Sequence, residues 1–261
     1  MKLRLFQIDA FTDQLFRGNP AGVCPLPEWL PDETLQKIAM ENNQAETAFY
    51  VRNRDGYRLR WFTPAVEVDL CGHATLAAAH VLFHFDGFAG PRIEFDSRSG
   101  PLTVRREGDL LTLDFPADTF APAETPRELI QGLGAEPVET FRGKTDFMLV
   151  YRSRKDIETM IPELSLVGRV KARGIIVTAP GDSVDFVSRF FAPQVGVPED
   201  PVTGSAHTTL APYWAARLGK TELSALQLSK RGGRLRCRLA GKRVEIAGQA
   251  RTYLRGEIEV E

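Results

Sequence analysis

The sequence has few cysteines and no excess of charge of either sign. Its 261 residues contain three cysteines, Cys24, Cys71 and Cys237. An odd number without C-x-x-C spacing excludes a disulfide framework and a cysteine zinc site, and it favours the reducing cytoplasm. The 33 basic and 34 acidic residues leave a formal charge of -1. This balance argues against nucleic acid or an anionic membrane as the main partner.

Long apolar runs and phosphate-binding motifs are also missing. No apolar run approaches the ~20 residues that a membrane-spanning helix needs. The N-terminal stretch MKLRLFQIDAF lacks the cleavage pattern of a signal peptide, so we expect neither feature. No G-x-G-x-x-G follows a predicted strand and no Walker motif occurs. The sequence therefore does not predict a parallel dinucleotide-binding sheet.

What the sequence contains is a series of short strands interrupted by a few helices. The pattern predicts helices from Pro31 and over 76–85, 127–132, 154–160 and 205–218, and strands that include 2–10, 21–26, 46–52, 57–62 and 251–260. Because short turns join most strands, we expect an α+β fold with largely antiparallel sheets and a few buried helices. The stretch 116–126, rich in Pro, Ala and Thr, is the predicted linker.

One pentapeptide occurs twice. Residues 60–64 read Arg-Trp-Phe-Thr-Pro and residues 189–193 read Arg-Phe-Phe-Ala-Pro, an offset of 129. Each copy ends a predicted strand and precedes a loop that contains an aspartate, Asp69 or Asp200, followed by a glycine at a helix start. The shared order of strand, loop and helix indicates a duplication rather than a chance match. The chain would then form two related halves.

The glycines of the two copies, Gly72 and Gly204, begin helices whose N-termini could bind an anion. Unpaired N–H groups and a partial positive charge attract a carboxylate there, and glycine lets a ligand approach the backbone closely. We expect both helix starts to face one cleft between the halves and to stabilise the negative charge of an enolate. Alternatively, the small residues at the two helix starts could serve packing only. Because the two starts form a matched pair, we favour an anion-binding site.

Four segments resemble the family named for the phenazine-biosynthesis isomerase, which has the diaminopimelate-epimerase-like fold. They are FRGNPAGV at 16–23, NQAETAF at 43–49, FTPAVEVDLCGHAT at 62–75 and EDPVTGSAH at 199–207. The resemblance implies a homodimer whose subunit has two pseudo-symmetric lobes, each a mostly antiparallel sheet curled around a central helix. We place the N-terminal lobe at 1–117, with the last strand, 249–261, crossing back to it, and the C-terminal lobe at 118–248.

The resemblance also implies residue roles. Glu46 would be the acid/base that takes a proton from one carbon and returns it to another, and His73, Asp200 and Ser205 would support it. Substrate contacts are expected from Asn19, Gly72, Ala74, Gly204 and Ala206. No metal, flavin or nucleotide cofactor is implied. The expected function is a cofactor-independent isomerase that shifts a double bond in a small carboxylate-bearing metabolite.

Each of these residues also has a purely structural interpretation. Glu46 could be an edge-strand residue that faces water, and His73 could cap its helix. Turn and helix-terminal chemistry is a sufficient explanation for Asn19, Asp200 and Ser205. We expect His80 and His84, on the apolar helix, to be structural, and His207 to face either the cleft or the core.

Two other functions stay open. Cys71 stands where a two-thiol epimerase has one catalytic cysteine, but Thr203 occupies the second position. A hydroxyl has a far higher pKa than a thiol, which excludes the paired-thiol reaction in its usual form. A one-thiol epimerase or dehydratase that uses Cys71 is the enzymatic alternative. A non-catalytic scaffold that binds a small ligand is the other.

Overall fold

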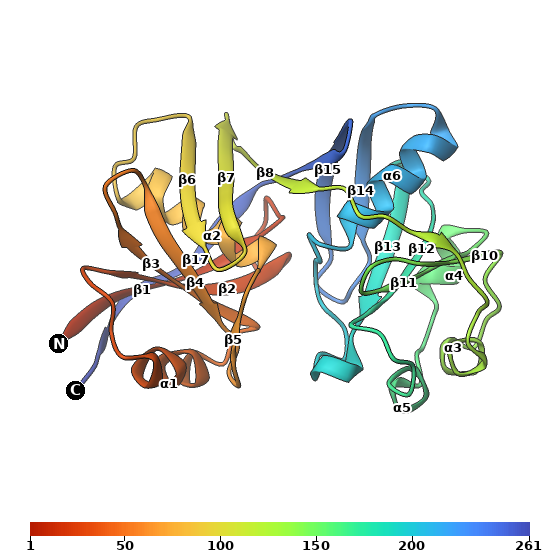
Figure 1. The fold of residues 1–261 in the computed structure, drawn as a ribbon, viewed down its shortest axis with the longest axis horizontal. Coiled ribbons are helices and arrows are strands. Elements are labelled where there is room, and N and C mark those ends of the chain that lie inside the picture. The colour runs from red at the N-terminus through yellow and green to blue at the C-terminus, as the bar shows by residue number, and fades with distance from the viewer. The chain divides into compact units, whose positions relative to one another are not determined.

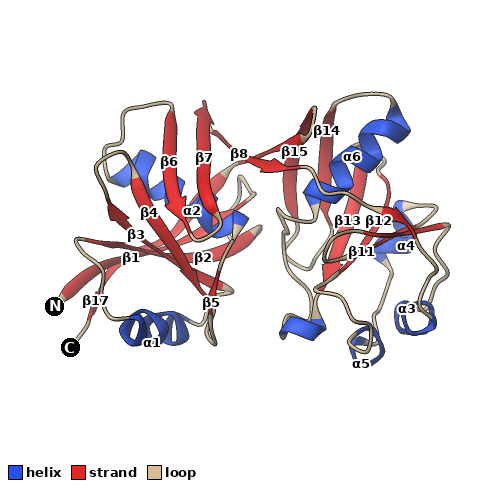
Figure 2. Cartoon of the chain, in the orientation of Figure 1, coloured by secondary structure: helices blue, strands red, loops and turns tan.

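The computed structural model describes residues 1–261, which divide into two compact units. Unit 1 comprises residues 1–114 and 247–261, and unit 2 comprises residues 115–246. Strands make up most of the regular structure in each unit, and helices are few (Figure 1, Figure 2). None of the helices has both the length and the apolar character needed to span a membrane.

The elements follow one another in the chain as short strands and helices. Unit 1 contains β1 (Lys2–Ala10), β2 (Asn19–Leu26), α1 (Asp32–Asn42), β3 (Glu46–Arg52), β4 (Tyr57–Phe62), β5 (Glu67–Val68), α2 (Gly72–Phe85), β6 (Arg92–Ser97), β7 (Gly100–Glu107), β8 (Leu110–Pro116) and β17 (Ala250–Glu259). Unit 2 contains β9 (Ala121–Pro122), α3 (Arg127–Leu133), β10 (Glu139–Arg142), β11 (Phe147–Val150), α4 (Arg154–Glu158), α5 (Leu164–Val167), β12 (Ile175–Pro180), β13 (Phe186–Phe191), a 3-10 turn (Pro193–Val195), α6 (His207–Leu218), β14 (Glu222–Gln227), β15 (Gly233–Ala240) and β16 (Arg243–Gly248).

The two units repeat one strand order. In unit 1, β1–β2, β3–β4 and β6–β7 are antiparallel pairs, whereas β2–β3 and β4–β6 are parallel. In unit 2, β10–β11, β12–β13 and β14–β15 are antiparallel, whereas β11–β12 and β13–β14 are parallel. The offset of 129 holds along this core, since β3 begins at Glu46 and β12 at Ile175. The predicted α+β class with duplicated, mostly antiparallel sheets is confirmed.

The last strand of the chain belongs to unit 1. β17 pairs antiparallel with β1 from Lys2 opposite Glu259 to Ala10 opposite Ala250. Figure 1 shows this as a blue strand beside the red N-terminal strand. The first and last strands therefore stabilise one unit together, although almost the whole sequence lies between them.

The longest helix of each unit connects two parallel strands, because parallel neighbours need a long connection. α2 lies in the connection from β4 to β6 and α6 in that from β13 to β14. α2 is buried along most of its length. In α6, the buried Trp214 stacks on Phe186 with ring centroids 5.7 Å apart, and its Nε1 donates to Thr178 Oγ1 at 3.0 Å. These helices carry the two repeated loops at their N-terminal ends.

The helix α1 supports β3 from outside. The predicted apolar stripe Leu35, Ile38 and Ala39 is buried, and it packs with Phe49 of β3 and Phe62 of β4. Sequence analysis missed α5, β5 and β9, since elements of two to four residues are too short to show a periodicity. Apart from these, the predicted helices and strands occur close to their expected positions.

Candidate active site

Glu46 is the first residue of β3, directly after the loop that follows α1. The helix ends at Asn43, whose φ of 48° is a left-handed conformation that Asn tolerates. Next to Glu46, the buried Thr47 accepts a hydrogen bond from Asn42 Nδ2 at 3.2 Å. A Cβ at Gly22 on the neighbouring strand would meet Thr47 Oγ1 at 2.8 Å. The backbone that carries Glu46 is therefore held on two sides.

His73 lies in the first turn of α2 and contacts two other predicted site residues. Its Nε2 is 3.2 Å from Glu46 Oε2, and its Nδ1 is 3.2 Å from Asn19 Nδ2. The His73 side chain is 7% exposed and the Glu46 side chain 20% exposed, while Asn19 is fully buried. Residues from β2, β3 and α2 thus meet in one polar group within unit 1.

The proton on the His73 ring is placed by its neighbours. An amide nitrogen only donates, so Nδ1 accepts from Asn19 and the ring proton sits on Nε2, which faces Glu46. Burial lowers the pKa of His73 to about 3. The ring is therefore neutral near pH 7. A neutral imidazole of this kind is a poor acceptor for a proton from Glu46, and it contacts the carboxylate without a hydrogen bond between Nε2 and Oε2.

Asn19 reaches His73 because of the tight turn that precedes it. Gly18 has a φ of +67°, and a Cβ there would meet Ala10 O at 2.2 Å, so only glycine fits. Asn19 then pairs with Ala10 across β1 and β2. Turn chemistry was a sufficient explanation for the Gly-Asn-Pro sequence. The structure adds that this turn places the Asn19 amide against the imidazole.

The first turn of α2 carries the two small residues that were predicted beside His73. Thr75 closes the turn, since its N and Oγ1 both donate to Cys71 O, at 3.1 and 2.6 Å. No side chain caps the helix, so the N–H groups of Gly72 and Ala74 have no partner within it. They are donors suited to a negatively charged group next to His73.

Cys71 precedes this turn and is the third polar neighbour of His73. Its side chain is buried and its Sγ is 3.5 Å from His73 Nδ1. One ligand atom each of Glu46, Cys71 and His73 lies within 4.8 Å of the others, a spacing that a metal ion could use. Cys71 and Glu46, however, contact opposite nitrogens of the ring, and Asn19 already donates to Nδ1. The group is not arranged around one coordination point, and we assign no metal to it.

The corresponding loop of unit 2 holds Asp200 and Thr203 in a closed network. Thr203 Oγ1 donates to Asp200 Oδ2 at 2.5 Å. The buried Gln227 of β14 donates to Asp200 O and accepts from Thr203 N, both at 2.8 Å. The hydroxyl at the position that corresponds to Cys71 is therefore a donor to a carboxylate.

His207 belongs to the core of unit 2. It is fully buried, its Nδ1 is 2.8 Å from Thr203 O, and its ring centroid lies 5.9 Å from that of Phe186. Burial lowers its pKa to about 4. Of the two orientations expected from the sequence, the structure shows the one that faces the core, and the Thr203 carbonyl orients the ring.

Ser205 is held by an arginine that sequence analysis did not identify. Arg173 Nη1 donates to Ser205 Oγ at 3.1 Å. The same guanidinium forms a bidentate ion pair with the buried Asp146 and lies 5.3 Å over the ring of Phe190. Because Arg173 has no acceptor, Ser205 Oγ accepts this bond and its own proton is left to donate. Ser205 is thus oriented as a hydrogen-bond donor.

The segment before α6 is a tight turn rather than helix, so the expected helix start at residue 205 is two residues early. Its three hydrogen bonds run to carbonyls three residues back, from the N–H groups of His207, Thr208 and Thr209 to Gly204, Ser205 and Ala206. The predicted residues Gly204 and Ala206 flank Ser205 in this turn. An unrecognised 3-10-like turn is the reason for the difference.

The two copies of the repeat align at their glycines and not at their aspartates. Counted back from the glycine, the counterpart of Asp200 is Val68. Asp69 has a side chain that is 78% exposed and lies 3.9 Å from Arg98. Each loop contains an aspartate, but the two aspartates occupy different positions, since Asp69 is a surface residue and Asp200 bonds to Thr203.

Two equivalent ion pairs hold the loops, and sequence analysis missed both. Arg60 donates to both Glu67 oxygens at 2.7 and 2.8 Å, and Arg189 donates to both Glu199 oxygens at 2.7 and 3.1 Å. We call these pairs the Arg60 clamp and the Arg189 clamp. Each guanidinium also lies over the aromatic ring two residues further on, at 5.1 and 4.9 Å. The signal was present, because each arginine opens the repeated pentapeptide and each glutamate stands five residues before its glycine.

Known proteins resemble this chain along its whole length. The family model described as phenazine biosynthesis-like protein matches residues 8–256. An uncharacterized isomerase of Pseudomonas aeruginosa is 54% identical over 260 residues, which cover 100% of both chains. The crystal structure of a phenazine biosynthesis PhzF-family protein of Enterococcus faecalis has a TM-score of 0.98 and 44% identity, and it covers 100% of both chains.

The fold also occurs in more distant proteins. A hydroxyproline epimerase from Agrobacterium vitis has a TM-score of 0.60 at 11% identity, with 98% of this chain and 92% of that chain covered. At this identity the likeness concerns the fold alone. It agrees with the duplicated, epimerase-like architecture described above.

Proposed function

The chain belongs to the phenazine biosynthesis-like family and is an isomerase, and we propose that Glu46 is its single acid/base. The substrate class that we propose is a small metabolite with a carboxylate and an acidic C–H bond. The observation that carries the proposal is the contact of 3.2 Å between Glu46 Oε2 and a buried, neutral His73. A positioned carboxylate of this kind has the geometry of a general base.

The proposed reaction moves one proton and one double bond. The Glu46 carboxylate takes a proton from one carbon of the substrate, and the electron pair of the C–H bond delocalises toward the unsaturated acid. The carboxyl group then returns the proton to a second carbon, so that the double bond shifts and no atom is gained or lost. The N–H groups at the start of α2 stabilise negative charge that develops nearby.

His73 would act on Glu46 and not on the substrate carbon. With a pKa of about 3, its ring is less basic than an ordinary carboxylate. The abstracted proton therefore stays on Glu46 until it is returned. The hydrogen bond from Asn19 keeps the ring in the tautomer whose Nε2 proton faces Glu46. Asn19 and His73 are positioning residues in this mechanism.

We further propose that Asp200 and Ser205 of unit 2 take part in the reaction. Their support is the oriented Ser205 hydroxyl and the fixed Asp200 carboxylate. A donor hydroxyl suits a substrate carboxylate, and a carboxylate suits a substrate amine or hydroxyl. We also propose that the enzyme works in the cytoplasm as a homodimer and needs no metal, flavin or nucleotide. Light scattering of the purified chain tests the dimer.

The test is proton exchange with solvent. A panel of small unsaturated carboxylic and amino acids is incubated with the enzyme in heavy water, and deuterium incorporation is followed by NMR. We expect Glu46→Gln to lower exchange by about 100- to 10,000-fold, the usual contribution of a general acid/base. Glu41→Gln, at an exposed position on α1, is the matched control and should exchange like the parent chain.

Two outcomes would contradict the proposal. Exchange that survives Glu46→Gln would remove Glu46 from the acid/base role. Binding of panel members to the parent chain without any exchange would favour a ligand-binding scaffold over the proposed proton transfer. Denaturation of the variant, monitored by circular dichroism, separates loss of the base from loss of the fold.

A further inference from the structure

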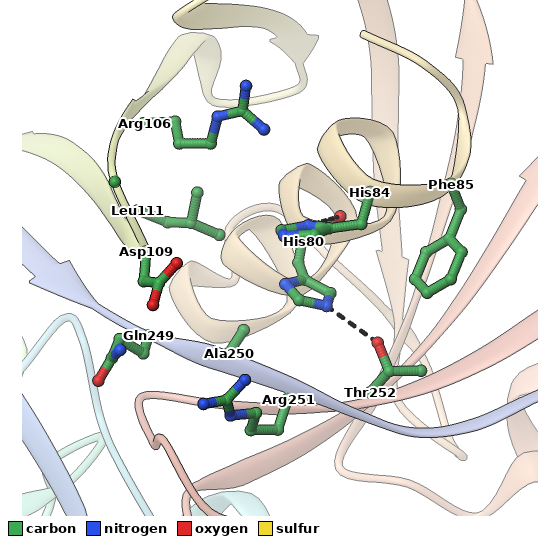
Figure 3. Close-up of a pocket in the computed structure, with 11 residues that line it drawn as sticks. His80, His84, Phe85, Arg106, Asp109, Leu111, Gln249, Ala250, Arg251 and Thr252 are labelled. Carbon is green, nitrogen blue, oxygen red and sulfur yellow. Dashed lines mark hydrogen bonds between the residues drawn. The ribbon is translucent and has the colours of Figure 1, made fainter.

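Unit 1 contains a cavity of about 330 Å³ that shares no residue with the Glu46–His73 group. It lies between the C-terminal half of α2, the turn from β7 to β8 and the beginning of β17 (Figure 3). This volume is within the range of small-molecule sites, which begins near 300 Å³. The cavity is lined by His80, His84, Phe85, Arg106, Gly108, Asp109, Leu111, Gln249, Ala250, Arg251 and Thr252.

Two stacked imidazoles form one wall of the cavity. The rings of His80 and His84 are 4.2 Å apart between centroids and inclined by 28°. His80 Nε2 is 2.9 Å from Thr252 Oγ1, and His84 Nδ1 is 2.9 Å from His80 O. Each ring therefore uses one nitrogen to hold the structure together. These bonds agree with the structural role expected for both histidines.

The remaining nitrogen of His80 has no partner. His80 is only 8% exposed, and its Nε2 is occupied by Thr252, so Nδ1 is the unused polar atom of a side chain more than nine-tenths buried. Figure 3 shows this nitrogen turned into the cavity, toward the side where Asp109 and Gln249 lie. Because this nitrogen faces the cavity, it is available to a ligand that enters there.

Two arginines without a carboxylate partner give the cavity a positive rim. The guanidinium of Arg106 lies over the ring of Phe83 at 4.4 Å and forms no ion pair. Arg251 Nε donates to Asp13 O at 2.9 Å, which leaves both terminal nitrogens as donors. Asp109 supplies one negative charge at the same rim, so the charged side chains sum to one positive charge.

We propose that this cavity is a second binding site, and that its ligand is a small monocarboxylate with an apolar body. Arg251 would bind the carboxylate and His80 Nδ1 would form one further hydrogen bond, while Arg106, across the cavity from Arg251 (Figure 3), adds positive charge. Phe85, Leu111 and Ala250 supply the apolar wall. Asp109 disfavours ligands with two or more negative charges, which selects a monoanion. The proposal does not depend on the reaction assigned to Glu46.

Benzoate is a suitable probe because it combines one carboxylate with a flat apolar ring. The full chain is labelled with nitrogen-15 at histidine and titrated with benzoate while the ring signals of His80, His84 and His73 are followed by NMR. We expect the His80 signals to shift in a saturable manner. Arg251→Gln should weaken binding about tenfold, the effect of one charge-assisted hydrogen bond, and Arg106→Gln, which removes only a more distant charge, should weaken it less.

Two control variants separate this site from its surroundings. Arg105→Gln removes a neighbouring cation of β7 that does not line the cavity, and Glu46→Gln alters only the proposed catalytic group. Both should leave the His80 titration unchanged. Failure of Glu46→Gln to abolish isomerisation therefore leaves this proposal intact. The absence of any His80 shift, or an equal affinity in Arg251→Gln and the parent chain, would overturn it.

Discussion

In unit 1 the first residue of β3 is Glu46, a carboxylate beside His73, whereas the residue 129 positions later, at the start of β12, is Ile175, which is buried in the core of unit 2. At the helix start, His73 of unit 1 corresponds to Ser205 of unit 2. The backbone that presents these residues follows the same strand order in both units. The duplicated scaffold thus carries a carboxylate beside a histidine in one copy only, at the position that we propose for the acid/base.

What the two copies have kept is the support of the loop. The Arg60 clamp and the Arg189 clamp join a strand to the loop before each helix with nearly the same geometry. Their surroundings differ, however. Glu67 is also 2.8 Å from Arg98, and Arg60 is 2.8 Å from Asp32. Glu199 has a single arginine partner. Loss of the arginine is therefore predicted to cost more stability in the Arg189 clamp than in the Arg60 clamp.

The largest expected effect comes from removing the arginine of each clamp. We expect Arg189→Met to lower the free energy of unfolding by about 3–5 kcal/mol, because Glu199 is then left without its cation. Arg189 also donates to Ile157 O and Met160 O, at 3.2 and 2.6 Å, and both bonds are lost. Arg60→Met should cost about 1–2 kcal/mol, since Arg98 still faces Glu67.

Urea denaturation of the two variants measures this difference. The matched control is the double variant Arg189→Met with Glu199→Gln, which removes the unpaired charge and should recover part of the lost stability. Equal losses in both single variants would mean that the extra partners in unit 1 have no energetic role. The same denaturation curves show whether unfolding remains cooperative.

A smaller effect is expected from pH, through the buried histidines of both units. Burial lowers the pKa of His207 to about 4, whereas an unfolded histidine titrates near 6.5. Between these values the unfolded chain binds a proton that the folded chain does not, so stability is complete above pH ~6.5 and falls as the pH decreases. One such group costs about 2 kcal/mol at pH 5.

The histidine prediction is tested by comparing stabilities at pH 7 and pH 5. His207→Gln should reduce the loss between the two pH values by about 2 kcal/mol, because the titrating group is absent. The pKa values of His73 and His80 in unit 1 are lowered to about 3. These two residues should therefore still make the stability of His207→Gln depend on pH. An unchanged loss in His207→Gln would show that this ring is protonated in the folded chain.

Much of the fold could be predicted from the sequence, because strands and helices leave local periodicities. The hairpin 46–52 and 57–62 and the stripe Leu35, Ile38 and Ala39 are of this kind, and the structure reproduces them. The family motifs placed Glu46 and His73 in one site, and the structure brings them within 3.2 Å. A motif that spans a loop and a helix start carries this information in a few adjacent residues.

The supporting residues could not be predicted in the same way. Ser205, Arg173 and Asp146 are distant in sequence and meet only in the folded chain. A hydrogen bond between side chains leaves no periodicity in the sequence, and Arg173 stands in a stretch with no family motif. The free ring nitrogen of His80 could not be predicted either. Only the folded chain places Thr252 at Nε2 and so shows that Nδ1 is the nitrogen without a partner.

The smallest effect is expected at Cys71, and it bears on the thiol alternative. His73 Nδ1 accepts from Asn19 and belongs to a ring whose pKa is about 3, so it is a poor base for a thiol 3.5 Å away. We therefore expect Cys71→Ser to change the exchange rate by less than about threefold, below 1 kcal/mol in barrier height. A complete loss of exchange would instead identify Cys71 as the base, which would contradict the role that we propose for Glu46.

The matched variant in unit 2 should behave differently. Thr203→Val removes the donor to Asp200 and the hydroxyl that contacts Gln227, both within a closed network. We expect it to cost about 1–3 kcal/mol in stability, the penalty of a buried polar group without its partner. Equivalent positions would then have opposite sensitivities, because Cys71 borders the proposed catalytic group without supporting it, whereas Thr203 holds its loop. Similar losses at both positions would mean that Cys71 is itself part of a structural network.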